Sequence, residues 1–151
     1  MVNLTVARFS RNQPNIQRVC SSAASADTPA CLMVFQDGPG YAKEDGAFKV
    51  PALFDELIQA KQMPVTVAVF VSPGTIEADR RKPPKVAARV RLNMIRWRSL
   101  RAILGGQFLP VALAGVNVSD DPAKRAIGGI SSGGICAFTA AWERPDQFGK
   151  K

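Results

Sequence analysis

Apolar and polar residues follow one another along the chain in blocks that predict a strand, a helix and a second strand. The apolar run 31–35 is followed by the turn residues 36–40 (QDGPG), a pattern typical of a buried strand that ends in a tight turn. Residues 51–61 begin with proline and repeat apolar side chains on one face, which predicts an amphipathic helix. Residues 64–71 are apolar and β-branched and predict another buried strand. Together they predict a βαβ unit with parallel strands and a right-handed crossover.

A second strand and helix are predicted near the end of the chain. Residues 126–130 are apolar and predict a strand, and residues 133–142 predict the helix that follows it. Residues 107–113 could form part of a helix, although Pro110 predicts a break or kink there. The alternation of predicted strands and helices therefore predicts an α/β architecture.

Length and composition are those of a single domain with an apolar core. The chain has 151 residues, of which 46% are hydrophobic. Two segments, 1–28 and 80–106, show neither helical nor strand periodicity, and we expect them to be atypical and poorly ordered parts of one domain, 1–151. No stretch approaches the ~18 apolar residues of a membrane span, and no apolar segment of signal-peptide length stands at the N-terminus. These patterns predict no membrane association and, by default, a cytoplasmic location.

Candidate metal ligands are sparse. The chain contains no histidine, and its three cysteines, Cys20, Cys31 and Cys136, are widely spaced and form no Cys-x-x-Cys pair. A transition-metal site and a disulfide framework are therefore not expected. Cys136 is expected to pack as a small apolar group inside a helix.

The net charge of +8 belongs to two blocks of the chain. Residues 80–119 hold seven arginines, two lysines and no acid, and residues 1–26 hold three arginines and no acid. Residues 80–101, with Trp97 between two arginines, could form a basic module for nucleic acid or an anionic surface. Their arginines do not gather on one helical face, so this is the alternative hypothesis, and nucleic acid is not the expected partner.

The motif that carries chemistry is GISSG, residues 129–133. It matches Gly-x-Ser-x-Gly, the nucleophile elbow, with an apolar strand before it and a helix after it. Ser131 would sit at a strained strand-to-helix turn, and Gly129 and Gly133 would approach too closely for side chains. The Ser132 N–H, at the helix start, would be one oxyanion donor. The other interpretation is a Gly/Ser loop that turns the chain or binds phosphate, although a P-loop lysine and dinucleotide-binding spacing are missing.

A second stretch, residues 35–41 (FQDGPGY), could supply another oxyanion N–H from the turn around Asp37 and Gly38. The alternative interpretation is a plain tight turn. Asp37 precedes Ser131, whereas the acid of an α/β-hydrolase triad usually follows the nucleophile, so we do not assign Asp37 that role.

Several segments resemble the esterases of the enterochelin-esterase (esterase D-like) group. The similar segments are LMVFQDG (32–38), VSPGT (71–75), DPAKR (121–125) and GISSGGICAF…AWERPD (129–146), within the wider regions 29–77 and 117–149. The resemblance implies a partial α/β-hydrolase sheet of mostly parallel strands with flanking helices, incomplete at the C-terminus. It also implies a serine hydrolase that cleaves a small-molecule carboxylic ester through an acyl-enzyme, with no metal or organic cofactor. By position, Ser131 would be the nucleophile, the Ser132 N–H an oxyanion donor, and the Asp37–Gly38 turn a border of the pocket.

The sequence also departs from that family. The triad acid and histidine of the family follow the elbow, and this chain contains neither after Ser131 in the expected pattern. Residues 86–100 are arginine-rich where the family carries acidic and aromatic residues. We therefore hypothesise a truncated and frameshifted esterase gene product that is inactive alone; a non-catalytic hydrolase-like scaffold is a further possibility. The sequence predicts neither the ester nor the oligomeric state.

Overall fold

A five-stranded sheet forms the centre of the protein, in a computed structural model that describes residues 3–5, 16–20, 28–71 and 108–149. The strand order is β1-β2-β4-β3-β5. The pairs β1–β2 and β2–β4 are antiparallel, whereas β4–β3 and β3–β5 are parallel. The strands are β1 (Asn3–Thr5), β2 (Ile16–Cys20), β3 (Cys31–Gln36), β4 (Thr66–Val71) and β5 (Arg125–Gly128).

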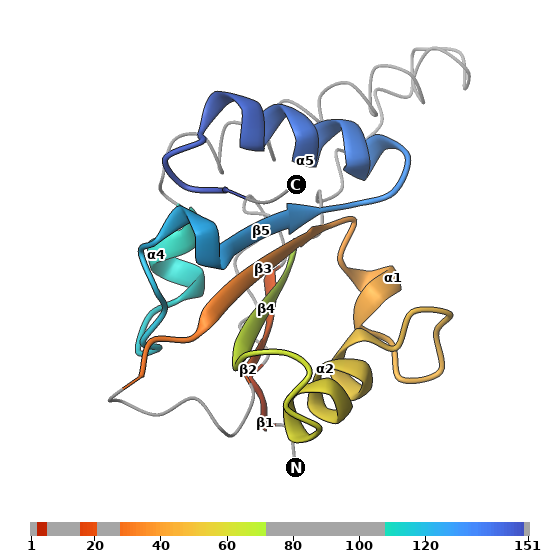
Figure 1. Ribbon diagram of the computed structural model, residues 1–151. Helices are drawn as coiled ribbons and strands as arrows, with labels where there is room; N and C mark the ends of the chain where they lie inside the picture. The colour runs from red at the N-terminus through yellow and green to blue at the C-terminus, as the bar shows by residue number, and fades with distance from the viewer. Residues whose placement is uncertain (1–2, 6–15, 21–27, 72–107, 150–151) are drawn as a thin grey trace, which may run out of the picture.

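Helices cover both faces of this sheet (Figure 1). The helices are α1 (Pro39–Ala42), α2 (Val50–Gln59), α4 (Phe108–Ala112), the 3₁₀ turn η1 (Pro122–Lys124) and α5 (Ser132–Glu143). On one face, alternate side chains of β3 and β4 pack against α4 and α5. On the other face, Phe35, Ala68 and Phe70 pack against Tyr41 and Val50 of α1 and α2. The protein is therefore a three-layer α/β arrangement.

The predicted βαβ unit is confirmed as β3, α2 and β4. β3 and β4 lie parallel in a register that pairs Leu32 with Val67. Every residue of β4 is buried, as expected for a strand covered on both faces, which explains its uninterrupted apolar sequence. β3 alternates in its first four residues because Cys31 and Met33 are half-buried, whereas Leu32 and Val34 are fully buried.

The predicted second strand and helix are confirmed as β5 and α5, with boundaries shifted by one or two residues. α4 lies within residues 107–113, for which the sequence allowed a helix, and Pro110 does not break it. Pro110 is the third residue of α4, where a backbone N–H has no intrahelical acceptor in any case, so proline removes no hydrogen bond.

Other features differ from the predictions or lie beyond the described residues. The sequence predicted no element before Cys31, and β1 and β2 lie there; β1 pairs with β2, and β2 pairs with β4. The turn after β3 continues into the short helix α1, which was not predicted. The segment 80–106 and the basic block 80–101 lie outside the described residues. Within the described residues, no helix has the length and apolar character to cross a membrane.

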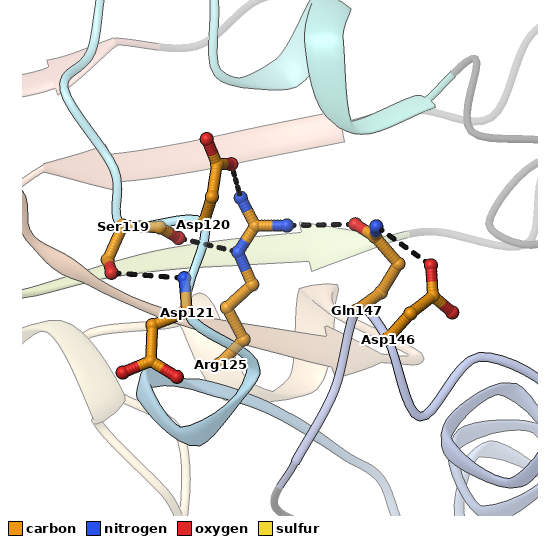
Figure 2. A network of polar contacts seen from close by, with 6 residues as sticks. All are labelled: Ser119, Asp120, Asp121, Arg125, Asp146 and Gln147. Atoms are coloured by element: carbon orange, nitrogen blue, oxygen red, sulfur yellow. Dashed lines mark hydrogen bonds and ion pairs between the residues drawn. The ribbon is translucent and has the colours of Figure 1, made fainter.

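A buried arginine joins the base of β5 to the chain that follows α5 (Figure 2). Arg125 is 7% exposed, and its guanidinium donates to the Ser119 carbonyl at 2.6 Å, to Gln147 Oε1 at 2.8 Å and to Asp120 Oδ1 at 2.6 Å. The Gly149 N–H also donates to the Pro122 carbonyl at 2.8 Å. These bonds connect the start of β5 to the residues that follow α5. They therefore hold β5 and α5 together at the end opposite the tight turn between them.

Candidate active site

Ser131 occupies a strained backbone conformation between β5 and α5. Its φ is 56° and its ψ is −118°, a region that residues with a side chain rarely adopt. Ser131 is exposed and directly precedes the first residue of α5, Ser132. The predicted sharp strand-to-helix turn is therefore present, with the strained residue at the central position of the motif.

The two outer glycines of the motif lie where an added side chain would meet close neighbours. A Cβ atom added to Gly129 would lie 2.5 Å from the carbonyl carbon of Gly133 and 2.7 Å from its oxygen. A Cβ atom added to Gly133 would lie 2.8 Å from Asp37 Oδ2 and 3.2 Å from the Gln36 carbonyl oxygen. All the close neighbours of Gly129 are backbone atoms, so this position accepts no side chain unless the backbone moves, whereas a side chain at Gly133 would displace the Asp37 carboxylate and press on Gln36. This geometry is the steric reason for a Gly-x-Ser-x-Gly spacing.

The turn after β3 lies beside this motif. Asp37 has a left-handed φ of 63°, and Gly38 follows it. The Gly38 N–H donates to the Val71 carbonyl at 2.9 Å, and a Cβ atom on Gly38 would lie 2.6 Å from the Phe70 backbone. Gly38 therefore packs tightly against the end of β4, and its N–H already has an acceptor. Among the described residues, no acceptor is found for the Asp37 N–H.

The Asp37 side chain reaches the N-terminal end of α5. Its Oδ2 accepts a long hydrogen bond of 3.4 Å from Ser132 Oγ. The same atom is the nearest neighbour of a Cβ atom added to Gly133. The structure thus brings together Asp37, Gly38, Ser131, Ser132 and the motif glycines, which the sequence had placed in two separate stretches.

Tyr41 is a site residue that the sequence analysis did not single out. It is 7% exposed, and its ring lies 5.1 Å from that of Phe35 and 4.9 Å from that of Phe48, measured between centroids. Burial raises the pKa of its hydroxyl, the Asp37 carboxylate raises it further, and a backbone hydrogen bond from Ile130 lowers it in part. Tyr41 therefore lies between the Asp37 turn and the residue before Ser131. Its place in α1, four residues after Asp37 in the chain, was the available signal.

Beneath the turn, Cys136 is buried, as predicted, and its thiol faces a polar partner. Sγ lies 3.7 Å from Gln36 Oε1, a weak hydrogen bond that the sequence did not predict. Gln36 is 3% exposed, and its Nε2 has no hydrogen-bond partner among the described residues. Gln36 and Cys136 therefore place polar groups between β3 and α5.

No metal-binding group was found in the part of the chain that the structure describes. There, no three His, Cys, Asp or Glu side chains gather in a way that could hold a metal ion. The polar groups near Ser131 are instead a carboxylate, a phenol and hydroxyls. Ser132 is the first residue of α5, and the N–H groups of a first helical turn have no intrahelical acceptor. Such a site can hold a partial negative charge beside the Ser131 hydroxyl.

Comparisons with known proteins identify the fold and the family. The enterobactin esterase of Shigella flexneri, solved with enterobactin, superposes with a TM-score of 0.66 at 20% identity, covering 99% of this chain and 35% of that one. The ferric enterobactin esterase of Salmonella typhimurium gives 0.60 at 20% identity, with 99% and 34% covered. A CE1 ferulic acid esterase of Anaeromyces mucronatus gives 0.66 at 9% identity, with 99% and 56% covered.

These similarities confirm the predicted α/β-hydrolase type of sheet, in partial form. The chain spans about a third of the length of the two enterobactin esterases. A search of curated protein sequences finds no match. A family model described as "Putative esterase" matches residues 23–150, most of the chain, including the arginine-rich segment. By that match, the chain belongs to this esterase family.

Proposed function

We propose that this chain carries the nucleophile and oxyanion site of a serine carboxylic-ester hydrolase. The observation that carries the proposal is the backbone of Ser131, a residue held at φ 56° and ψ −118° between two glycines that touch. Strain of this kind costs on the order of 1–3 kcal/mol and persists where the surrounding structure enforces it, commonly at functional sites. A turn needed only to reverse the chain would place glycine at this position, which removes the strain.

Two backbone N–H groups are suited to bind the oxyanion that forms when Ser131 attacks an ester carbonyl. The Ser132 N–H stands at the start of a 12-residue helix, where the helix dipole also favours negative charge. We assign the second donor to the Asp37 N–H, because the Gly38 N–H is already bonded to Val71. Gly38 then has the supporting role of packing the turn against β4.

The reaction proposed is acyl transfer in two halves. Ser131 Oγ forms a bond to the acyl carbon, the bond to the alcohol oxygen breaks, and the hydroxyl proton passes to a base. Water then cleaves the acyl-enzyme and releases the carboxylic acid. Ser131 needs a general base within hydrogen-bond reach, and the 151 residues contain no histidine. We therefore propose that the 151-residue chain has negligible turnover by itself, because the proposed nucleophile lacks the usual histidine base.

Chemical rescue tests this proposal. Imidazole, supplied in solution at increasing concentration, can replace the missing base when the purified chain is mixed with a p-nitrophenyl ester. We expect an imidazole-dependent burst of p-nitrophenolate, up to one equivalent per chain, above the reaction of imidazole alone. Ser131→Ala should abolish the burst, and Ser132→Ala, the adjacent hydroxyl, should keep it. A burst that survives in Ser131→Ala, or is lost only in Ser132→Ala, would overturn the assignment.

A further inference from the structure

Asp37 places a carboxylate beside the proposed nucleophile, and none of the described residues supplies a cation that pairs with it. In the described part of the chain, the ion pairs found are Arg125–Asp120 and Arg144–Asp146, and Asp37 takes part in neither. Asp37 is half-buried, and its backbone follows directly from the end of β3, so the position of its carboxylate is set by the sheet. A carboxylate so placed is a fixed negative charge at the site.

The hydrogen bonds of this carboxylate are also incomplete. An ionised carboxylate can accept about four hydrogen bonds. The described residues give it one, the long 3.4 Å contact from Ser132 Oγ. Burial and the Asp37 charge raise the pKa of the Tyr41 hydroxyl, so Tyr41 adds a neutral group to the surroundings of the carboxylate. With respect to the described residues, Asp37 therefore keeps free acceptor positions next to the first turn of α5.

We propose that Asp37 determines specificity at this site: it favours esters whose acyl group carries a cation or a hydrogen-bond donor, and disfavours esters with an anionic acyl group. The proposal rests on the proposed role of Ser131, because the acyl group of a bound ester must lie next to that hydroxyl. Asp37 Oδ2 and Ser132 Oγ, one residue from the nucleophile, are 3.4 Å apart, so an acyl group attached to Ser131 passes close to the carboxylate.

The expected size of the effect follows from Coulomb's law. At a separation on the order of 7 Å and an effective dielectric constant of about 40, one charge on the ester changes the rate about sevenfold. A cationic and an anionic ester of the same shape should then differ about fiftyfold. The effect should shrink as salt is added, because the site is partly open to solvent.

Three p-nitrophenyl benzoates provide the test, with a guanidino group, hydrogen or a carboxylate at the para position. The full chain is acylated in the presence of imidazole, and each rate is divided by the rate of imidazole alone, which removes differences in intrinsic reactivity. We expect the corrected rates to fall in the order guanidino, hydrogen, carboxylate. Asp37→Asn should reduce the guanidino-to-carboxylate ratio about tenfold or more, because the charge is removed while asparagine tolerates the left-handed backbone.

Glu143→Gln is the matched control. It removes the same charge from the exposed far end of α5, about 17 Å along the helix from Ser132. The control should leave the ratio unchanged. The wild-type ratio should also fall when salt is raised, a measurement that needs no variant.

The outcomes separate the two proposals. If Asp37→Asn lowers all three rates equally and keeps the ratio, Asp37 is a structural residue and the specificity proposal is overturned. An unselective wild type, or a ratio that is insensitive to salt and to Asp37→Asn, also overturns it. If none of the three esters acylates Ser131, the proposed function itself fails.

Discussion

Gly129→Ala is expected to destabilise the protein strongly, because it forces a methyl group into the tight turn. The added Cβ would lie 2.5 Å, 2.7 Å and 3.0 Å from the carbonyl carbon, carbonyl oxygen and Cα of Gly133. All three neighbours are backbone atoms at the start of α5, so they cannot move aside by rotating a side chain. Relief requires the helix to shift away from β5, against the buried contacts of Ala137, Ala140 and Ala141.

Overpacking of this kind costs about 3 kcal/mol. With a urea dependence of about 2 kcal/mol per molar, the midpoint of unfolding should fall by roughly 1.5 M. The assay is urea unfolding of the purified chain, followed by circular dichroism.

Gly128→Ala supplies the control one residue earlier. There an added Cβ would meet Met33 Cε at 4.0 Å, an ordinary contact. The midpoint should therefore stay the same or rise slightly, since alanine restricts the unfolded chain more than glycine does. Equal midpoints for the two variants would refute the claim that Gly129 and Gly133 form the close contact of an elbow.

Three further predictions concern strain, ionisation and the buried arginine. Ser131→Gly should raise the free energy of unfolding by about 1 kcal/mol, because glycine adopts the φ of 56° without strain; an unchanged or lower stability would show that the residue is not strained. Tyr41 is the sole tyrosine of the chain, so an ultraviolet titration reports its pKa directly. This pKa should lie above the usual 10.0 and should fall in Asp37→Asn. A normal pKa would contradict the burial of Tyr41 beside a carboxylate. Because the native state then holds the phenol proton more tightly than the unfolded state, stability should be constant below about pH 10 and decline above it. Arg125→Leu should lower the free energy of unfolding in urea by about 3 kcal/mol, because the Ser119 carbonyl and Gln147 lose their buried donor. Asp120→Asn, at a side chain that is 98% exposed, should lower it by less than about 1 kcal/mol. Equal losses would contradict the view that the buried hydrogen bonds of Arg125 matter more than its exposed ion pair.

The layered core could be predicted from sequence because its signals are local. Residues 31–35 and 67–71 are continuous apolar runs of strand length, and the helix between them has one apolar face. The spacing of Gly129, Ser131 and Gly133 likewise predicts its own geometry, because the close approach is between residues four apart in the chain. In each case the structure is determined by contacts between residues close in the chain, or by an apolar pattern with a regular period.

The remaining features depend on contacts between distant segments. Asp37 meets Ser132 across 95 residues, and Cys136 meets Gln36 across 100, distances over which no periodic pattern extends. β1 and β2 were not predicted because their partly polar sequences are held by strand pairing, β1 with β2 and β2 with β4, rather than by their own propensity. Tyr41 was not singled out because α1 has only four residues, too few for a helical period to be recognised.

The position of the acyl group tests the central claim most directly. After reaction with a p-nitrophenyl ester and imidazole, the chain is digested and the modified residue is located by tandem mass spectrometry. We predict a single adduct on Ser131, absent when the chain is unfolded in urea before the reaction. An adduct on Ser132, or labelling spread over lysines and serines at the same level in folded and unfolded chain, would contradict the role of this turn as the site of acyl transfer.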